Sequence, residues 1–147
     1  MPPKVDPTPA AKSLENVGWR RGRQLPDRHN VYQMVSPDGR DRLVQFRGRS
    51  ESENSAGQYL YGIYYGEFDT VDEVVLWSRL ENSMLVLPTA WLRQLFDENL
   101  ARIDRNRWHV NVYFEKWEGF AWVVPVNYGD DGRYRVPEEY VVSFRAA

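Results

Sequence analysis

The stretch VYQMVSPDGRDRLVQFR (residues 31–47) decides the fold class, because two strand-like segments flank a turn. VYQMVS and RLVQFR are rich in β-branched and aromatic residues, which favour strands. Between them lies Pro37-Asp38-Gly39, whose proline and glycine suit the backbone angles of a tight turn. The stretch therefore predicts an antiparallel hairpin.

Strand-like segments continue almost to the end of the chain, and many are bounded by turn residues. They are YLYGIYYGEF (59–68), DEVVLWSR (72–79), SMLVLP (83–88), WHVNVYF (108–114), FAWVVPVN (120–127), RYRV (133–136) and YVVSF (140–144). Residues of WHVNVYF alternate in polarity, so His109 is expected on the solvent side of its strand.

One helix is clear in the sequence, over about residues 89–103. Thr89, directly after Pro88, is in position to cap it, and apolar residues follow at helical spacing. We therefore expect an α+β domain in which this main helix packs on a mixed or mostly antiparallel sheet. The expected core includes Trp91, Leu95, Phe96, Val110, Val112, Trp122 and Val124.

The first residues differ in composition from the rest. Residues 1–12 are proline-rich and are expected to form a flexible tail, and residues 13–147 a single domain. Residues 10–17 could form a short helix, and WRRGRQLPDRHN (19–30) is expected to be a loop or a helix end. The chain has no cysteine, no apolar run long enough to cross a bilayer and no signal-like N-terminus. We expect a cytoplasmic protein without membrane contacts.

Charge is distributed unevenly along the chain. Residues 1–50 contain ten Lys or Arg against five acids, and residues 51–147 contain nine against sixteen. Arginine grips a phosphate with two parallel hydrogen bonds, so the basic half predicts a surface that contacts nucleic acid, either DNA or RNA. The residues expected to make these contacts are Arg20, Arg21, Arg23, Arg40, Arg42, Arg47, Arg49 and Tyr61.

The acidic second half and an isoelectric point near 5.7 favour a different class of function. Under this alternative the chain is a protein-interaction module that docks a partner through its sheet or an aromatic patch.

A family resemblance adds a third possibility. The hairpin, the strand RLVQFRGRS, the strand YLYGIYY and the segment ending in MLVLPTAWLRQLF resemble small members of the PD-(D/E)XK, or restriction-endonuclease-like, superfamily over residues 30–96. In that family an acid on one hairpin strand and a Glu/Gln-x-Lys motif on the next hold Mg²⁺ and orient water. Gln45-Phe46-Arg47 occupies the place of the motif. The resemblance implies, as an alternative, a Mg²⁺-dependent nuclease using Asp38, Asp41, Gln45 and Arg47.

The departures from that pattern argue against catalysis. Asn30, Val31 and Tyr32 stand where the first acid is needed, and Arg47, which cannot lose a proton near neutrality, replaces the lysine. None of the lysines lies two residues after an acid, and His29 and His109 lack further ligands at metal-binding spacing. We therefore expect a degenerate nuclease-like core that binds nucleic acid without a cofactor.

Overall fold

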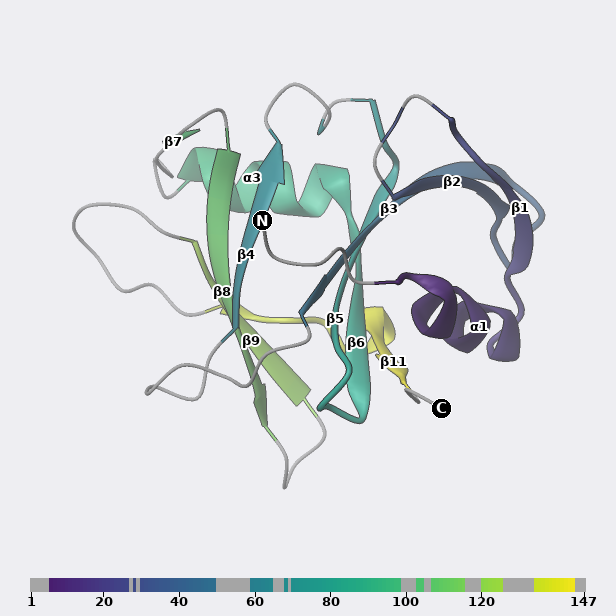
Figure 1. The fold of residues 1–147 in the computed structure, drawn as a ribbon. Coiled ribbons are helices and arrows are strands. Elements are labelled where there is room, and N and C mark those ends of the chain that lie inside the picture. Colours follow the sequence, from purple (N-terminus) through teal and green to yellow (C-terminus); the bar gives the residue numbers. More distant parts are fainter. Residues whose placement is uncertain are drawn as a thin grey trace.

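A computed structural model of the chain shows an α+β fold with strands in two sheets (Figure 1). The structure describes residues 6–26, 28, 30–49, 59–64, 68, 70–98, 103–104, 107–115, 120–125 and 134–144. Its helical elements include α1 (Thr8–Asn16), α3 (Thr89–Glu98) and the short 3₁₀ helix η1 (Glu138–Tyr140).

Six strands form the larger sheet, called sheet A. In spatial order they are β1 (Arg20–Gln24), β2 (Val31–Val35), β3 (Asp41–Arg49), β5 (Glu73–Ser78), β6 (Ser83–Pro88) and β11 (Val141–Ser143). Only β3 and β5 run parallel to each other; the other neighbours in this sheet are antiparallel. The predicted hairpin is confirmed as β2 and β3, and Gly39 has the positive φ of 85° that its turn requires.

The smaller sheet, called sheet B, is antiparallel throughout. Its strands are β10 (Tyr134–Arg135), β9 (Phe120–Pro125), β8 (Arg107–Glu115) and β4 (Tyr59–Tyr64), and β7 (Ile103–Asp104) also pairs with β8. The strands thus divide between two sheets, whereas the sequence suggested one.

Three layers build the molecule. Sheet B and α3 cover one face of sheet A, and their shared core includes Val74, Leu85, Leu95, Phe96 and Val110. Helix α1 covers the opposite face (Figure 1). There Leu14 packs with side chains such as Phe46 and Trp77. Sheet A is therefore buried on both faces, which explains the continuous apolar runs of β5 and β6.

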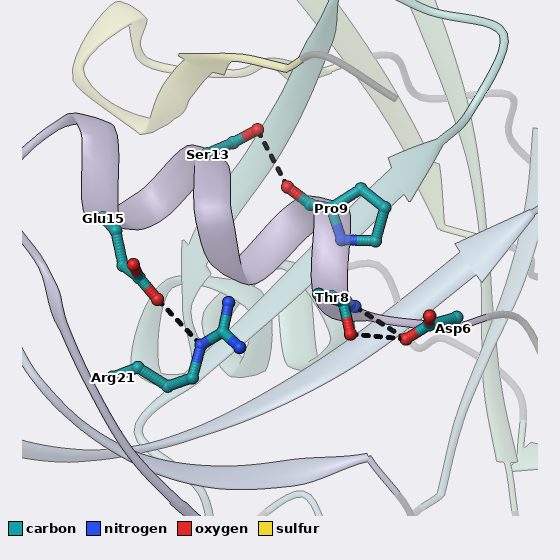
Figure 2. A network of polar contacts seen from close by, with 6 residues as sticks. All are labelled: Asp6, Thr8, Pro9, Ser13, Glu15 and Arg21. Atoms are coloured by element: carbon teal, nitrogen blue, oxygen red, sulfur yellow. Dashed lines mark hydrogen bonds and ion pairs between the residues drawn. The ribbon is translucent and has the colours of Figure 1, made fainter. Parts of the chain in front are cut away.

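Helix α1 begins earlier than the sequence suggested. The carboxylate of Asp6 accepts hydrogen bonds from the backbone N–H (3.0 Å) and the hydroxyl (2.7 Å) of Thr8, and Pro9 occupies the first turn, where a missing N–H costs nothing (Figure 2). Ala10 and Ala11 are buried. The expected tail boundary at residue 12 is therefore wrong, since residues 8–12 belong to the packed fold; residues 1–5 lie outside the described part.

Two further expectations need correction. The main helix is confirmed, but Ile103 lies in β7, where pairing with Trp108 replaces the helical continuation that its spacing suggested. Trp122 alternates with the buried Ala121 and Val123 and therefore lies on the outer face of sheet B, not in the core. Of the other expected core residues, Trp91 is half-buried against the core, and the side chain of Val124 lies outside the described residues.

Candidate nucleic-acid interface

Three of the predicted arginines lie on one edge strand. Arg20, Arg21 and Arg23 are exposed on β1, which among the described strands pairs with β2 alone. The sequence suggested a loop or a helix end here; β1 forms a strand because β2 offers it a hydrogen-bonding edge. Gly22 is required, since a Cβ atom there would lie 2.2 Å from the carbonyl oxygen of Gln33, and the pairing register shifts at this point as in a β-bulge.

Two more predicted arginines lie on the hairpin beside β1. Arg40 is exposed beside the β2–β3 turn, and Arg42 is half-buried on β3. Met34 pairs with Arg21 on one side and with Arg42 on the other, so the two arginines flank it on the α1 side of the sheet. We call Arg20, Arg21, Arg23, Arg40 and Arg42 the arginine arm.

Weak ion pairs engage part of the arginine arm. Arg21 Nε lies 2.7 Å from a carboxylate oxygen of Glu15 on α1 (Figure 2), and Arg40 Nε lies 3.5 Å from Asp38. Hydrogen bonding from the Ser36 hydroxyl lowers the pKa of Asp38, so this acid stays ionised beside Arg40. Exposed pairs of this kind contribute about 0–1 kcal/mol and can exchange for a phosphate. Within the described part of the chain, the other three arginines of the arm form no ion pair.

The second predicted group of arginines does not join the arginine arm. Gln45 is fully buried, and it pairs with Val31 and Val74, which face sheet B. Arg47 and Arg49 follow at alternate positions, so they lie half-buried on the same inter-sheet face. Arg47 and Arg49, which were expected to contact nucleic acid, therefore lie apart from the arginine arm on a face that sheet B covers.

Tyr61 is also misplaced by the sequence prediction. It lies on the inner face of β4 with 2% of its surface exposed, and its hydroxyl donates a 2.8 Å hydrogen bond to the backbone carbonyl of Trp77. Burial raises the pKa of Tyr61 well above its usual value. The ring cannot reach a base, and its role is to join the two sheets.

The residues of the nuclease alternative do not converge. Asp41 and Gln45 are four positions apart on β3, which places their backbones about 13 Å from each other. Metal–oxygen bonds of about 2.0–2.6 Å leave no common site for them. Asp38 lies in the turn beyond Asp41, and Arg47 lies further along the strand in the opposite direction. In the described residues no group of three or more His, Asp or Glu side chains is placed to hold a metal ion.

One carboxyl beside the arginine arm has an unusual protonation equilibrium. Glu73, the first residue of β5, has a pKa raised to about 7. Burial is the main cause, and the negative charges of Asp72 and Asp38 add to it, while Arg42 partly opposes the increase. Carboxyl groups with shifted pKa values are common at functional sites. The pKa of Tyr140 is raised by burial and, to a smaller extent, by the charges of Glu139 and Glu73.

The outer face of sheet B is a surface that the sequence prediction did not include. His109 lies there as expected, together with Tyr113 and Trp122. The alternation in WHVNVYF was the available signal, but the apolar run FAWVVP does not reveal which of its residues point outward.

Comparisons with known proteins assign no family to this arrangement. Neither family models nor curated proteins nor solved structures gave a match to the chain. The resemblance to the restriction-endonuclease-like superfamily therefore stays a prediction. None of the described helices combines the length and apolar character of a membrane span.

Proposed function

We propose that the protein is a non-catalytic nucleic-acid-binding domain whose arginine arm contacts phosphates. The observation that supports this most directly is the exposure of Arg20, Arg21 and Arg23 on a single edge strand, with Arg40 and Arg42 on the adjoining hairpin. Between residues 20 and 42 the chain has six arginines against three aspartates. Such a concentration of guanidinium groups attracts a polyanion and releases the counterions condensed on it.

The structure of β1 also favours a phosphate-bearing ligand over a protein partner that would add a strand to sheet A. Charged side chains and a β-bulge on an edge strand prevent another strand from extending the sheet. β1 has both features, so its free edge is poorly suited to a protein partner that adds a strand. Side chains remain the means of contact, and arginine side chains select phosphates and carboxylates.

Salt dependence provides the test. Labelled single-stranded and duplex DNA and RNA are titrated by fluorescence anisotropy at several salt concentrations, with wild type, Arg20→Ala and Arg23→Ala. Each arm variant should weaken binding and reduce the slope of log K against log salt by about one, because one phosphate contact is lost. Arg79→Ala removes an exposed arginine in the turn between β5 and β6, outside the arm, and should leave the slope unchanged.

Two results would overturn the proposal. One is the absence of binding to every nucleic acid at low salt, after which the protein-interaction module becomes the function to test. The other is binding that Arg79→Ala weakens as much as the arm variants do, since this would mean that net charge alone is responsible. Circular dichroism melts of all variants show whether the strand has kept its structure.

A further inference from the structure

The outer face of sheet B carries half-buried and exposed side chains along its described strands. On β8 the buried residues Trp108, Val110, Val112 and Phe114 alternate with half-buried ones, and on β4 the buried Tyr59, Tyr61 and Ile63 alternate with more exposed ones. The buried set packs against sheet A and α3. The alternate set projects from the opposite side of the sheet, where no described helix or strand covers it (Figure 1).

Aromatic and cationic residues dominate this open face. Tyr113 and Trp122 are directly paired across β8 and β9, and Arg135 on β10 pairs with Trp122. The three side chains therefore form one row across the sheet, with neighbouring Cβ atoms about 5 Å apart. On β8 the same face continues through Asn111 and His109 to Arg107, which lies at the far end of the strand.

A glycine leaves room beside the cations. Gly62 on β4 pairs with His109, and a Cβ atom at Gly62 would lie 3.1 Å from the stem of Arg107 and 3.5 Å from the imidazole of His109. Both side chains thus extend over the glycine, and the Nε atom of Arg107 is buried there.

These residues do little for the fold itself. They lie opposite the packed core, and a cross-strand aromatic pair on a solvated face adds only about 0.2–1 kcal/mol to sheet stability. Of the charged residues on this face, Arg135 is exposed, whereas Arg107 is half-buried and pairs across the strands with Asp104. Aromatic rings beside an exposed arginine match a ligand with flat rings and negative charges. An acidic peptide has negative charges but no regularly spaced flat rings to stack on the aromatic side chains. A neutral sugar has flat faces but no negative charge.

We propose that the outer face of sheet B binds single-stranded nucleic acid, with bases stacked on Tyr113 and Trp122 and a phosphate paired with Arg135. Bases in a duplex are already stacked on one another and cannot lie on these rings, so the face selects single strands. This inference rests on the proposed function and adds to it a substrate class and a second surface, distinct from the arginine arm.

Substitutions that separate stacking from other contacts provide the test. The probe is a labelled oligothymidylate of about 12 nucleotides, which matches the site size of known single-strand binding folds. Tyr113→Thr/Trp122→Thr removes both rings and keeps β-forming residues, and it should weaken binding by roughly fivefold to 150-fold for each stack lost. Tyr113→Phe/Trp122→Phe keeps two rings and should retain binding within a few-fold.

A matched control lies on the same face. Leu60 on β4 is 42% exposed, and Leu60→Thr removes apolar area without removing a ring. It should leave binding to oligothymidylate unchanged. Equal losses in Leu60→Thr and in the double threonine variant would mean that apolar area, not stacking on the rings, holds the oligonucleotide, which overturns the proposal. The proposal is also overturned if the double phenylalanine variant, still folded by its melting curve, loses binding.

The outcomes also separate this inference from the proposed function. If wild type binds no nucleic acid, both fail. If wild type binds single strands and duplexes equally, and Arg20→Ala weakens binding while the double threonine variant does not, the arginine arm is the binding site and only this inference fails. A preference for single strands that disappears in the double threonine variant supports the inference.

Discussion

Glu73→Gln should stabilise the protein at pH 8 and leave its stability unchanged at pH 4. The pKa of Glu73 is about 7 in the folded chain against an ordinary value of 4.5. Burial is the principal cause, so the folded chain favours the neutral carboxyl, for which glutamine is a close substitute. The wild-type side chain contributes its full stability below pH 4.5, and this contribution is lost as the pH rises to 7.

The magnitude follows from the two pKa values. The rise of the Glu73 pKa from 4.5 to about 7 corresponds, without screening, to a loss of roughly 3 kcal/mol in the free energy of unfolding at pH 8. Glu73 is only half-buried, and Arg42 partly offsets its charge, so solvent and counter-charge screening reduce the expected effect. We expect Glu73→Gln to raise the free energy of unfolding by about 1–2 kcal/mol at pH 8.

Urea denaturation at pH 4 and pH 8 measures this effect, with Glu138→Gln as a control. Glu138 is an exposed carboxyl in η1, and its replacement should change the free energy of unfolding by less than about 0.5 kcal/mol at both pH values. The reasoning about Glu73 is refuted if Glu73→Gln is no more stable than wild type at pH 8. It is also refuted if the variant is more stable than wild type by the same amount at both pH values, because the gain would then have no link to a proton.

Three further predictions concern packing and chemistry. Gly48→Ala should lower the free energy of unfolding, measured by urea denaturation, by about 1–3 kcal/mol, because its new Cβ would lie 2.4 Å from the buried indole of Trp77. Gly62→Ala should lower it far less, because its new Cβ meets only side chains that can move. Leu14→Ala should cost about 2–5 kcal/mol, since this fully buried side chain joins α1 to sheet A; a change under about 0.5 kcal/mol would contradict that packing. Wild type should not cleave plasmid DNA or RNA with Mg²⁺ or Mn²⁺, and cutting that is lost in Asp41→Ala, at an exposed position, would restore the nuclease alternative.

The sequence was informative where structure is local. The β2–β3 hairpin depends on a turn tripeptide and two short strand segments, and α3 depends on apolar spacing within a few turns, so both were predictable. β1 was missed because its residues carry no apolar pattern, and a neighbouring strand decides its conformation. Gly22 is the one local sign of close backbone approach in that segment.

The candidate site was harder to predict, because tertiary packing decides which face of each strand is exposed to solvent. In LVQFRGR the apolar Val44 and Phe46 alternate with the polar Gln45 and Arg47, which is the usual pattern of a strand with one wet face. β3 instead lies in the middle of sheet A, and sheet B covers the polar side. The segment itself gives no sign of sheet B, because the strands of that sheet come mostly from residues 59–64 and 107–125.

The layered architecture explains why the proposed contacts move from the centre of the fold to its periphery. A strand with neighbours on both edges and packing on both faces, such as β3, presents few side chains to a ligand. Regular rows of accessible side chains arise at an edge strand and on the free face of an outer layer. β1 is such an edge and carries three arginines of the arginine arm, and sheet B is such a layer and carries Tyr113 and Trp122. Substitutions at Gln45 therefore report on folding, whereas substitutions on β1 and on the outer face of sheet B report on binding.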